Sequence, residues 1–119
     1  MLKKRKPIFL ENSKIPRYLS ILSPINIKAI TLFCFVLSTG SINEKTRRHE
    51  TIHFQQYLET LVVGFLLIYI FDFIVGYMKY KNGYMAYRMI SLEQEAHMYD
   101  DVESYLATRT RYTWLKLRP

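Results

Sequence analysis

The stretch "RRHETIHFQQ", residues 47–56, decides how the rest of this sequence is interpreted. It places His49 and His53 four residues apart and puts Glu50 directly after the first of them. On a helix, residues i and i+4 lie on one face, so both imidazoles can point at one metal ion. Glu50 lies beside that point rather than on it, where its carboxylate can take a proton from a metal-bound water. The HExxH pattern therefore predicts a helix that carries two zinc ligands and a general base.

Chance is the competing explanation of this pattern, with the three side chains simply solvated on one helix face. The chain has 3 histidines in all, and two of them stand in the pattern with a glutamate in the required place. Because most of the histidines in the chain fall in this one pattern, a metal site is favoured over chance. Two histidines leave zinc under-coordinated, so a third ligand must come from elsewhere. The sequence has no third histidine at the short downstream spacing of an HExxHxxGxxH motif, so the third ligand should be a carboxylate. Glu93 and Glu95 are the best candidates, because both lie at the start of a later predicted helix.

Upstream of the pattern, the sequence predicts an irregular segment followed by a strand. Residues 1–24 contain prolines at three places, which disfavours a long helix, so we expect an irregular lead-in. Residues 25–37 are rich in β-branched and aromatic side chains and end at a Ser-Thr-Gly-Ser turn, which predicts a strand. The HExxH helix then begins near Thr46, a potential N-cap, and runs to about residue 63.

An apolar stretch at residues 61–78, "LVVGFLLIYIFDFIVGYM", continues this helix. It has a single charged residue, Asp72, and its length is close to what a membrane span requires. Lys79 and Lys81 at its far end are typical of an interfacial anchor. We therefore expect association with a lipid membrane. The alternative is the core helix of a cytoplasmic protein, but a chain of 119 residues has little surface with which to cover such a helix.

A second helix is expected from Ser91 to about residue 108, with Gln94 as the capping-box partner of Ser91. Residues 109–119 are basic and aromatic and fit either a short strand or a surface anchor. The whole chain is expected to form a single domain, 1–119, that is mainly α with a small β component.

A Glu93 ligand constrains the path of the apolar stretch. If residues 51–80 formed one straight helix, its end would lie about 43 Å from the metal. The thirteen residues that follow reach about the same distance only when fully extended. The stretch must therefore bend, most naturally at Gly64 or Gly76, unless the chain returns fully extended beside it.

The net charge and the cysteine content limit which binding partners and which cysteine-based sites the chain can have. The formal net charge is +7, and the basic residues flank apolar stretches, which favours anionic lipid. No nucleic-acid-binding motif is present in the sequence, so nucleic acid is not expected as a partner. Cys34 is the single cysteine, which excludes an internal disulfide and a cysteine-based zinc site.

HETIH at residues 49–53, followed by SLEQEAH at residues 91–97, resembles the gluzincin superfamily of zinc metallopeptidases. The likeness extends to the small minigluzincins and to integral-membrane relatives of the CAAX prenyl-protease and HtpX type. Over residues 24–110 the chain is also similar to short uncharacterised bacterial and phage proteins with RHExIHxxQ and AYRxISxExEA motifs. In the gluzincins a glutamate of a later helix, in an ExxA pattern, completes the zinc site.

The resemblance implies that Glu93 is the third Zn²⁺ ligand, with Glu95 as the alternate, and that Glu50 is the catalytic base. Gluzincins carry an aspartate that orients a ligand histidine; this chain has His97 at that place, so His97 or the nearby Asp100 is expected to take the role. Further residues could support the site or donate a proton to an oxyanion: His97, Tyr87, Arg88 and Gln56.

The expected function is zinc-dependent peptide hydrolysis, with a peptide or protein substrate aligned along the strand at residues 28–37. The main rival is a non-catalytic small membrane or virion protein with a structural or relic metal site. A third hypothesis is that the chain is a metal-dependent hydrolase that acts on a non-peptide bond.

Overall fold

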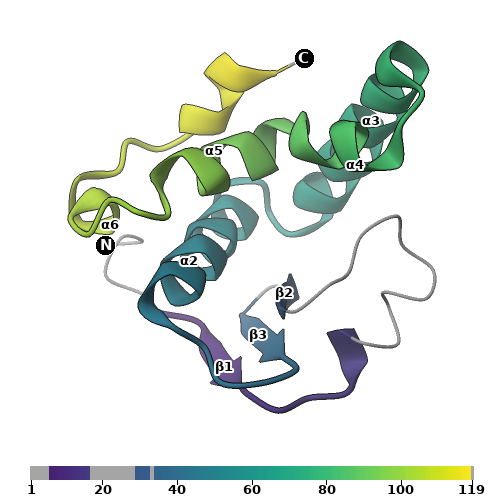
Figure 1. The fold of residues 1–119 in the computed structure, drawn as a ribbon. Coiled ribbons are helices and arrows are strands. Elements are labelled where there is room, and N and C mark those ends of the chain that lie inside the picture. The colour runs from purple at the N-terminus through teal and green to yellow at the C-terminus, as the bar shows by residue number, and fades with distance from the viewer. Residues whose placement is uncertain (1–5, 17–28, 33, 119) are drawn as a thin grey trace.

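The computed structural model describes residues 6–16, 29–32 and 34–118. Its elements, in chain order, are β1 (Ile8–Leu10), β2 (Ala29–Leu32), β3 (Phe35–Ser38), α2 (Glu44–Glu59), α3 (Val63–Tyr80), α4 (Gly83–Arg88), α5 (Ser91–Tyr99), α6 (Tyr105–Thr108) and the 3-10 helix η2 (Thr113–Leu117). Helix α2 lies between the small sheet and α5, while α3 and α4 run side by side at one end of the molecule (Figure 1). The prediction of a mainly α fold with a small β component is confirmed.

The sheet has the order β1-β3-β2, with β1 parallel and β2 antiparallel to β3. The single strand predicted at residues 28–37 is wrong, because Leu32 pairs with Phe35 and the segment folds into a tight hairpin. No Gly, Asn, Asp or Pro marks this turn, so composition alone gave no signal for it. The predicted irregular lead-in also supplies a strand, β1, and its residues 17–24 lie outside the described part of the chain.

Helix α2 begins earlier than expected. Its N-cap is Asn43, whose Oδ1 accepts a hydrogen bond of 2.8 Å from the backbone N–H of Thr46, so the predicted Thr46 cap is wrong. Asparagine is the stronger cap because its short side chain reaches the free N–H groups of the first turn. The helix ends at Glu59.

The break between α2 and α3 falls at Leu61 and Val62, whose φ angles are 57° and 66°. The predicted bend at Gly64 or Gly76 is therefore wrong in position. Left-handed backbone is costly for a β-branched residue, so no sequence rule points to Val62. Gly76 serves packing instead, because a Cβ there would lie 3.1 Å from Cα of Ala86 in α4.

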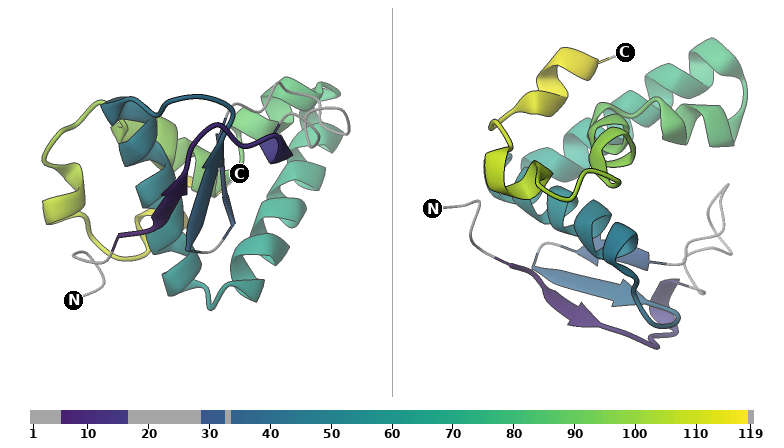
Figure 2. Two further views of the ribbon diagram at one scale, coloured as in Figure 1. Left: turned by 90° about the horizontal axis from the view of Figure 1, so that it is seen from below. Right: turned by 60° about the vertical axis from the view of Figure 1, so that its left-hand side comes forward.

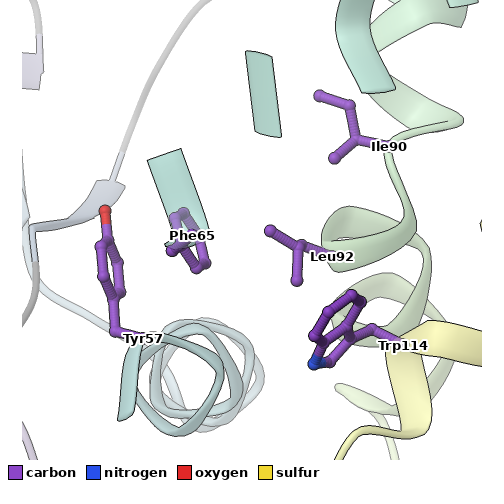
Figure 3. Close-up of a cluster of buried hydrophobic side chains, with 5 residues drawn as sticks. All are labelled: Tyr57, Phe65, Ile90, Leu92 and Trp114. Carbon is purple, nitrogen blue, oxygen red and sulfur yellow. The ribbon is translucent and has the colours of Figure 1, made fainter. Parts of the chain in front are cut away.

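Helix α3 is long and apolar enough to cross a membrane by length and composition, although only 17% of it is buried. Its buried side carries Phe65 into the main hydrophobic cluster, whose five buried side chains are drawn in Figure 3. The buried members of this cluster are Tyr57, Phe65, Ile90, Leu92 and Trp114. These contacts place α3 directly beside the start of α5.

The second predicted helix is divided. Helix α5 ends at Tyr99, and a turn separates it from the short α6. Ser91 does not form the predicted capping box, because its hydroxyl donates to Asp72 Oδ2 (2.6 Å) and the Gln94 amide donates to backbone carbonyls. The C-terminal segment is not a strand, because residues Thr113–Leu117 form the 3-10 helix η2, which buries Trp114.

Candidate metal centre

Helices α2 and α5 bring three ligand-type side chains to one point. His49 and His53 lie on one face of α2, and the side-chain ligand atoms of these two residues and Glu93 all lie within 4.8 Å of one another. Oε1 of Glu93 is 3.3 Å from Nε2 of His49 and 3.2 Å from Nε2 of His53. The two helices are held together by buried Ile52 and Ala96. The group could hold a metal ion, and the prediction that Glu93 lies beside the histidine pair is confirmed.

Each histidine is oriented through its other ring nitrogen. Nδ1 of His49 lies 3.0 Å from Oδ2 of Asp100, and Nδ1 of His53 lies 2.8 Å from Oε1 of Gln56. Both partners are hydrogen-bond acceptors, so Nδ1 carries the proton and donates in each ring. The Nε2 atoms of both rings then face Glu93, in position to bind a metal ion once any proton on them is released, as in metal-ligand histidines. Of the two residues expected to orient a ligand, Asp100 contacts His49.

Buried polar atoms without a hydrogen-bond partner are what a site that binds a cation would contain. Among the described residues, these atoms are Nε2 of His53, Oε1 of Glu93 and Oδ1 of Asp100. Such atoms are rare in proteins because each loses its hydration on burial. Two of them belong to the triad, and a cation bound there would satisfy both. The two imidazoles and one carboxylate match the donor set of a catalytic zinc site.

The electrostatics of the triad are those of a site built around a cation. Burial opposes a charge on His49, but hydrogen bonds to Asp100 and Glu93 and the attraction of Glu93 and Glu50 raise its pKa to about 10. Burial likewise opposes the ionised form of Glu93, yet the two histidines hold its pKa well below the usual range. In the metal-free chain a proton therefore takes the place that a metal cation would occupy.

Zinc binding is expected to release protons near pH 7. His49, with a pKa of about 10, is protonated there and must become neutral to ligate a metal. As the pH falls, proton competition grows, so the apparent zinc affinity should fall as well. Calorimetric titration of zinc into the metal-free protein, in buffers of different ionisation enthalpy, measures the protons released. Binding without proton release would contradict this account of His49.

Glu50 is positioned by the sheet. Its Oε1 accepts a hydrogen bond of 2.7 Å from the hydroxyl of Thr31 in β2, and its Oε2 lies 3.9 Å from Nε2 of His49. The carboxylate therefore stands next to the triad without joining it, as predicted for a general base. Sequence reasoning missed Thr31, because a threonine in an apolar strand carries no signal of its own.

Tyr69 of α3 is a second residue that the sequence did not reveal. Its hydroxyl donates to Oε2 of Glu93 at 2.7 Å, which leaves Oε1 to face the histidines. Burial and the charge of Glu93 raise the pKa of Tyr69 well above its usual value, so the hydroxyl keeps its proton. Phe65, one helical turn earlier, packs edge-on against the His53 ring. Helix α3 thus forms one wall of the site.

The predicted supporting residues divide into two groups. The ring of His97 lies 4.6 Å from that of His49, and its Nδ1 lies 2.9 Å from the backbone carbonyl of Glu93. The hydroxyl of Tyr87 is 3.5 Å from Nε2 of His97, so both side chains border the triad. Burial and the negative charge of Glu93 raise the pKa of Tyr87, which keeps it a proton donor. Arg88 is exposed at the end of α4.

Glu95, the alternate ligand, is used elsewhere. Its carboxylate pairs with buried Arg109 and accepts hydrogen bonds from the Gln56 amide (2.9 Å) and the Tyr105 hydroxyl (2.6 Å). Arg109 also pairs with Glu59. The structure therefore places Glu93, and not Glu95, beside the histidine pair. Gln56 joins this buried network to His53 and is 0% exposed, so it is not a solvated side chain.

Comparison of this chain with protein-family models, curated proteins and solved structures gave no match.

Proposed function

We propose that this chain is a zinc-dependent metallopeptidase of the gluzincin type. The observation that carries the proposal is the convergence of His49, His53 and Glu93 within 4.8 Å, with Glu50 beside them. Two imidazoles and a carboxylate, with a separate carboxylate at the edge of the group, form the donor set of zinc hydrolases. The resemblance of HETIH and SLEQEAH to the gluzincins supports the same assignment.

In this proposal each nearby side chain has one task. His49, His53 and Glu93 hold Zn²⁺, which when bound supplies Lewis-acid activation of a water and of the substrate carbonyl. Glu50, fixed by Thr31, takes the proton of the attacking water and passes it to the leaving amine. Tyr87 and His97 border the site, where a proton donor can stabilise the developing oxyanion.

The substrate is proposed to lie beside β2. This strand is at one edge of the sheet formed by the described residues, and it packs against α2 next to Glu50. An extended peptide can add to such an edge through backbone hydrogen bonds. The expected alignment segment thereby narrows from residues 28–37 to Ala29–Leu32. Because backbone groups are the same in every peptide, side-chain preference is expected to be loose.

The protein is also proposed to work at a membrane. Support comes from the length and apolar composition of α3, which pass the criterion for a span, and from the net charge of +7. Because α3 carries Tyr69 to Glu93, a membrane-bound α3 would hold the metal site close to the lipid surface.

Removal of the metal tests the proposed activity. Zinc-loaded protein is expected to cleave an unstructured protein substrate such as casein, and a chelator should abolish cleavage because the water loses its activating ion. Added zinc should restore it. The measurement is the appearance of new peptide termini by mass spectrometry. Zinc-loaded, folded protein that cleaves neither casein nor a broad peptide library would contradict the proposal and favour the non-catalytic rival.

A further inference from the structure

One long face of α3 is apolar and exposed. Its side chains recur at helical spacing and are between 48% and 67% exposed: Val63, Leu66, Leu67, Ile70, Phe71, Ile74, Tyr77 and Met78. We call these eight residues the α3 face. It carries no charged side chain. The left view of Figure 2 shows α3 along one side of the molecule. A continuous apolar surface of this kind marks a site that another surface covers.

The opposite side of α3 is fixed to the rest of the protein along its length. Tyr69 donates to Glu93, and Gly76 packs against Ala86. Asp72 has 0% exposure and accepts hydrogen bonds from Ser91 and from the Arg118 guanidinium, whose nearest nitrogen is 2.7 Å away. Crossing a bilayer would force α3 either to abandon these partners or to carry their polar groups into hydrocarbon, and both are costly.

The charges around the α3 face are of one sign. Residues 63–90 and 113–118, which cover α3, α4 and η2, contain a single acidic side chain, the buried Asp72. Their basic side chains are all exposed: Lys79, Lys81, Arg88, Lys116 and Arg118. The guanidinium of Arg118 lies 5.8 Å from the Phe71 ring, at the edge of the α3 face itself. An apolar surface on a part of the protein whose exposed charges are all basic fits an anionic bilayer surface.

We propose that α3 lies parallel to the plane of an anionic membrane, with the α3 face immersed in one leaflet and the opposite side still packed on the protein. This arrangement deepens the proposed membrane association and replaces a span with a one-sided, monotopic attachment. It rests on the α3 contacts and charges alone, so it holds whether or not the metal centre is catalytic.

Binding to lipid vesicles tests whether an anionic membrane covers the α3 face. The full chain should float with vesicles of phosphatidylcholine and phosphatidylglycerol, and more weakly with pure phosphatidylcholine. Replacing Leu67 and Ile70 together, Leu67→Gln with Ile70→Gln, should lower the partition coefficient at least about tenfold, because two buried apolar side chains are lost. The matched control, Ile8→Gln with Leu10→Gln, removes the same two residue types from the exposed side of β1 and should bind as the wild type does.

Depth measurement tests the orientation. Spin labels on Val63→Cys, Ile70→Cys and Met78→Cys, each in a Cys34→Ser background, should report similar depths within one leaflet. A label at Ile70 near the bilayer centre, with the other two at opposite surfaces, would overturn the proposal in favour of a span. Absence of vesicle binding would also overturn it, as would self-association through the α3 face in its place, measured by sedimentation. All these measurements can be made on metal-free protein. Their outcome therefore does not depend on whether the chain is a peptidase.

Discussion

Replacing Glu50 by glutamine is expected to abolish peptide cleavage while zinc remains bound. Glutamine has nearly the same shape and can still accept the hydrogen bond from Thr31, so the local fold should persist. It cannot take a proton from water, and loss of a general base lowers the rate by about 100-fold to 10,000-fold. Glu50 lies outside the triad, so the metal content should be unchanged. The measurements are cleavage rate and zinc content on the same preparation.

Glu44 provides the matched control, because it is an exposed glutamate in the first turn of the same helix. Glu44→Gln should keep both activity and zinc. Full activity in the Glu50 variant would contradict its role as the base. Loss of zinc from that variant would show that Glu50 contributes to metal binding, which the geometry of the triad does not predict.

The second large effect concerns stability. Arg109 pairs with Glu59 and Glu95, and the three side chains are 1%, 2% and 0% exposed. Arg109→Met removes the cation and leaves two carboxylates buried without a counter-charge. Breaking a buried ion pair in this way costs about 3–5 kcal/mol of unfolding free energy. Because Glu95 also holds Gln56, which holds His53, weaker zinc binding should accompany the loss of stability.

Urea unfolding of the metal-free protein measures this loss without the contribution of bound zinc. Arg111→Met is the control, since Arg111 is exposed two residues away, and its unfolding free energy should change by less than about 0.5 kcal/mol. An Arg109 variant as stable as the wild type would contradict the network as a structural element.

The parts of the site that sequence could predict are those set by local periodicity. His49, Glu50 and His53 are fixed relative to one another by one turn of helix, so their spacing was sufficient. Glu93 could be proposed because a zinc site needs a third donor and few acids stand in the later helix. The choice between Glu93 and Glu95 rested on resemblance alone, since both point from α5 into buried surroundings.

The parts that sequence could not predict depend on contacts between distant segments. Thr31 reaches Glu50 over 19 residues, and Tyr69 reaches Glu93 over 24. Neither residue type is unusual in an apolar element, so only the packed structure identifies it. The break at Leu61 and Val62 was hidden for a related reason, because Val62 has positive φ and packs against a cluster built from distant segments.

Zinc content per chain tests the central claim most directly, measured on folded wild-type protein, Glu93→Gln and Glu95→Gln after equilibration with limiting free zinc. The account predicts a single zinc ion in the wild type, loss in the Glu93 variant and only weakened binding in the Glu95 variant. Glu93 alone faces the two histidines, whereas Glu95 acts on His53 through Gln56. Retention in the Glu93 variant together with loss in the Glu95 variant would contradict it.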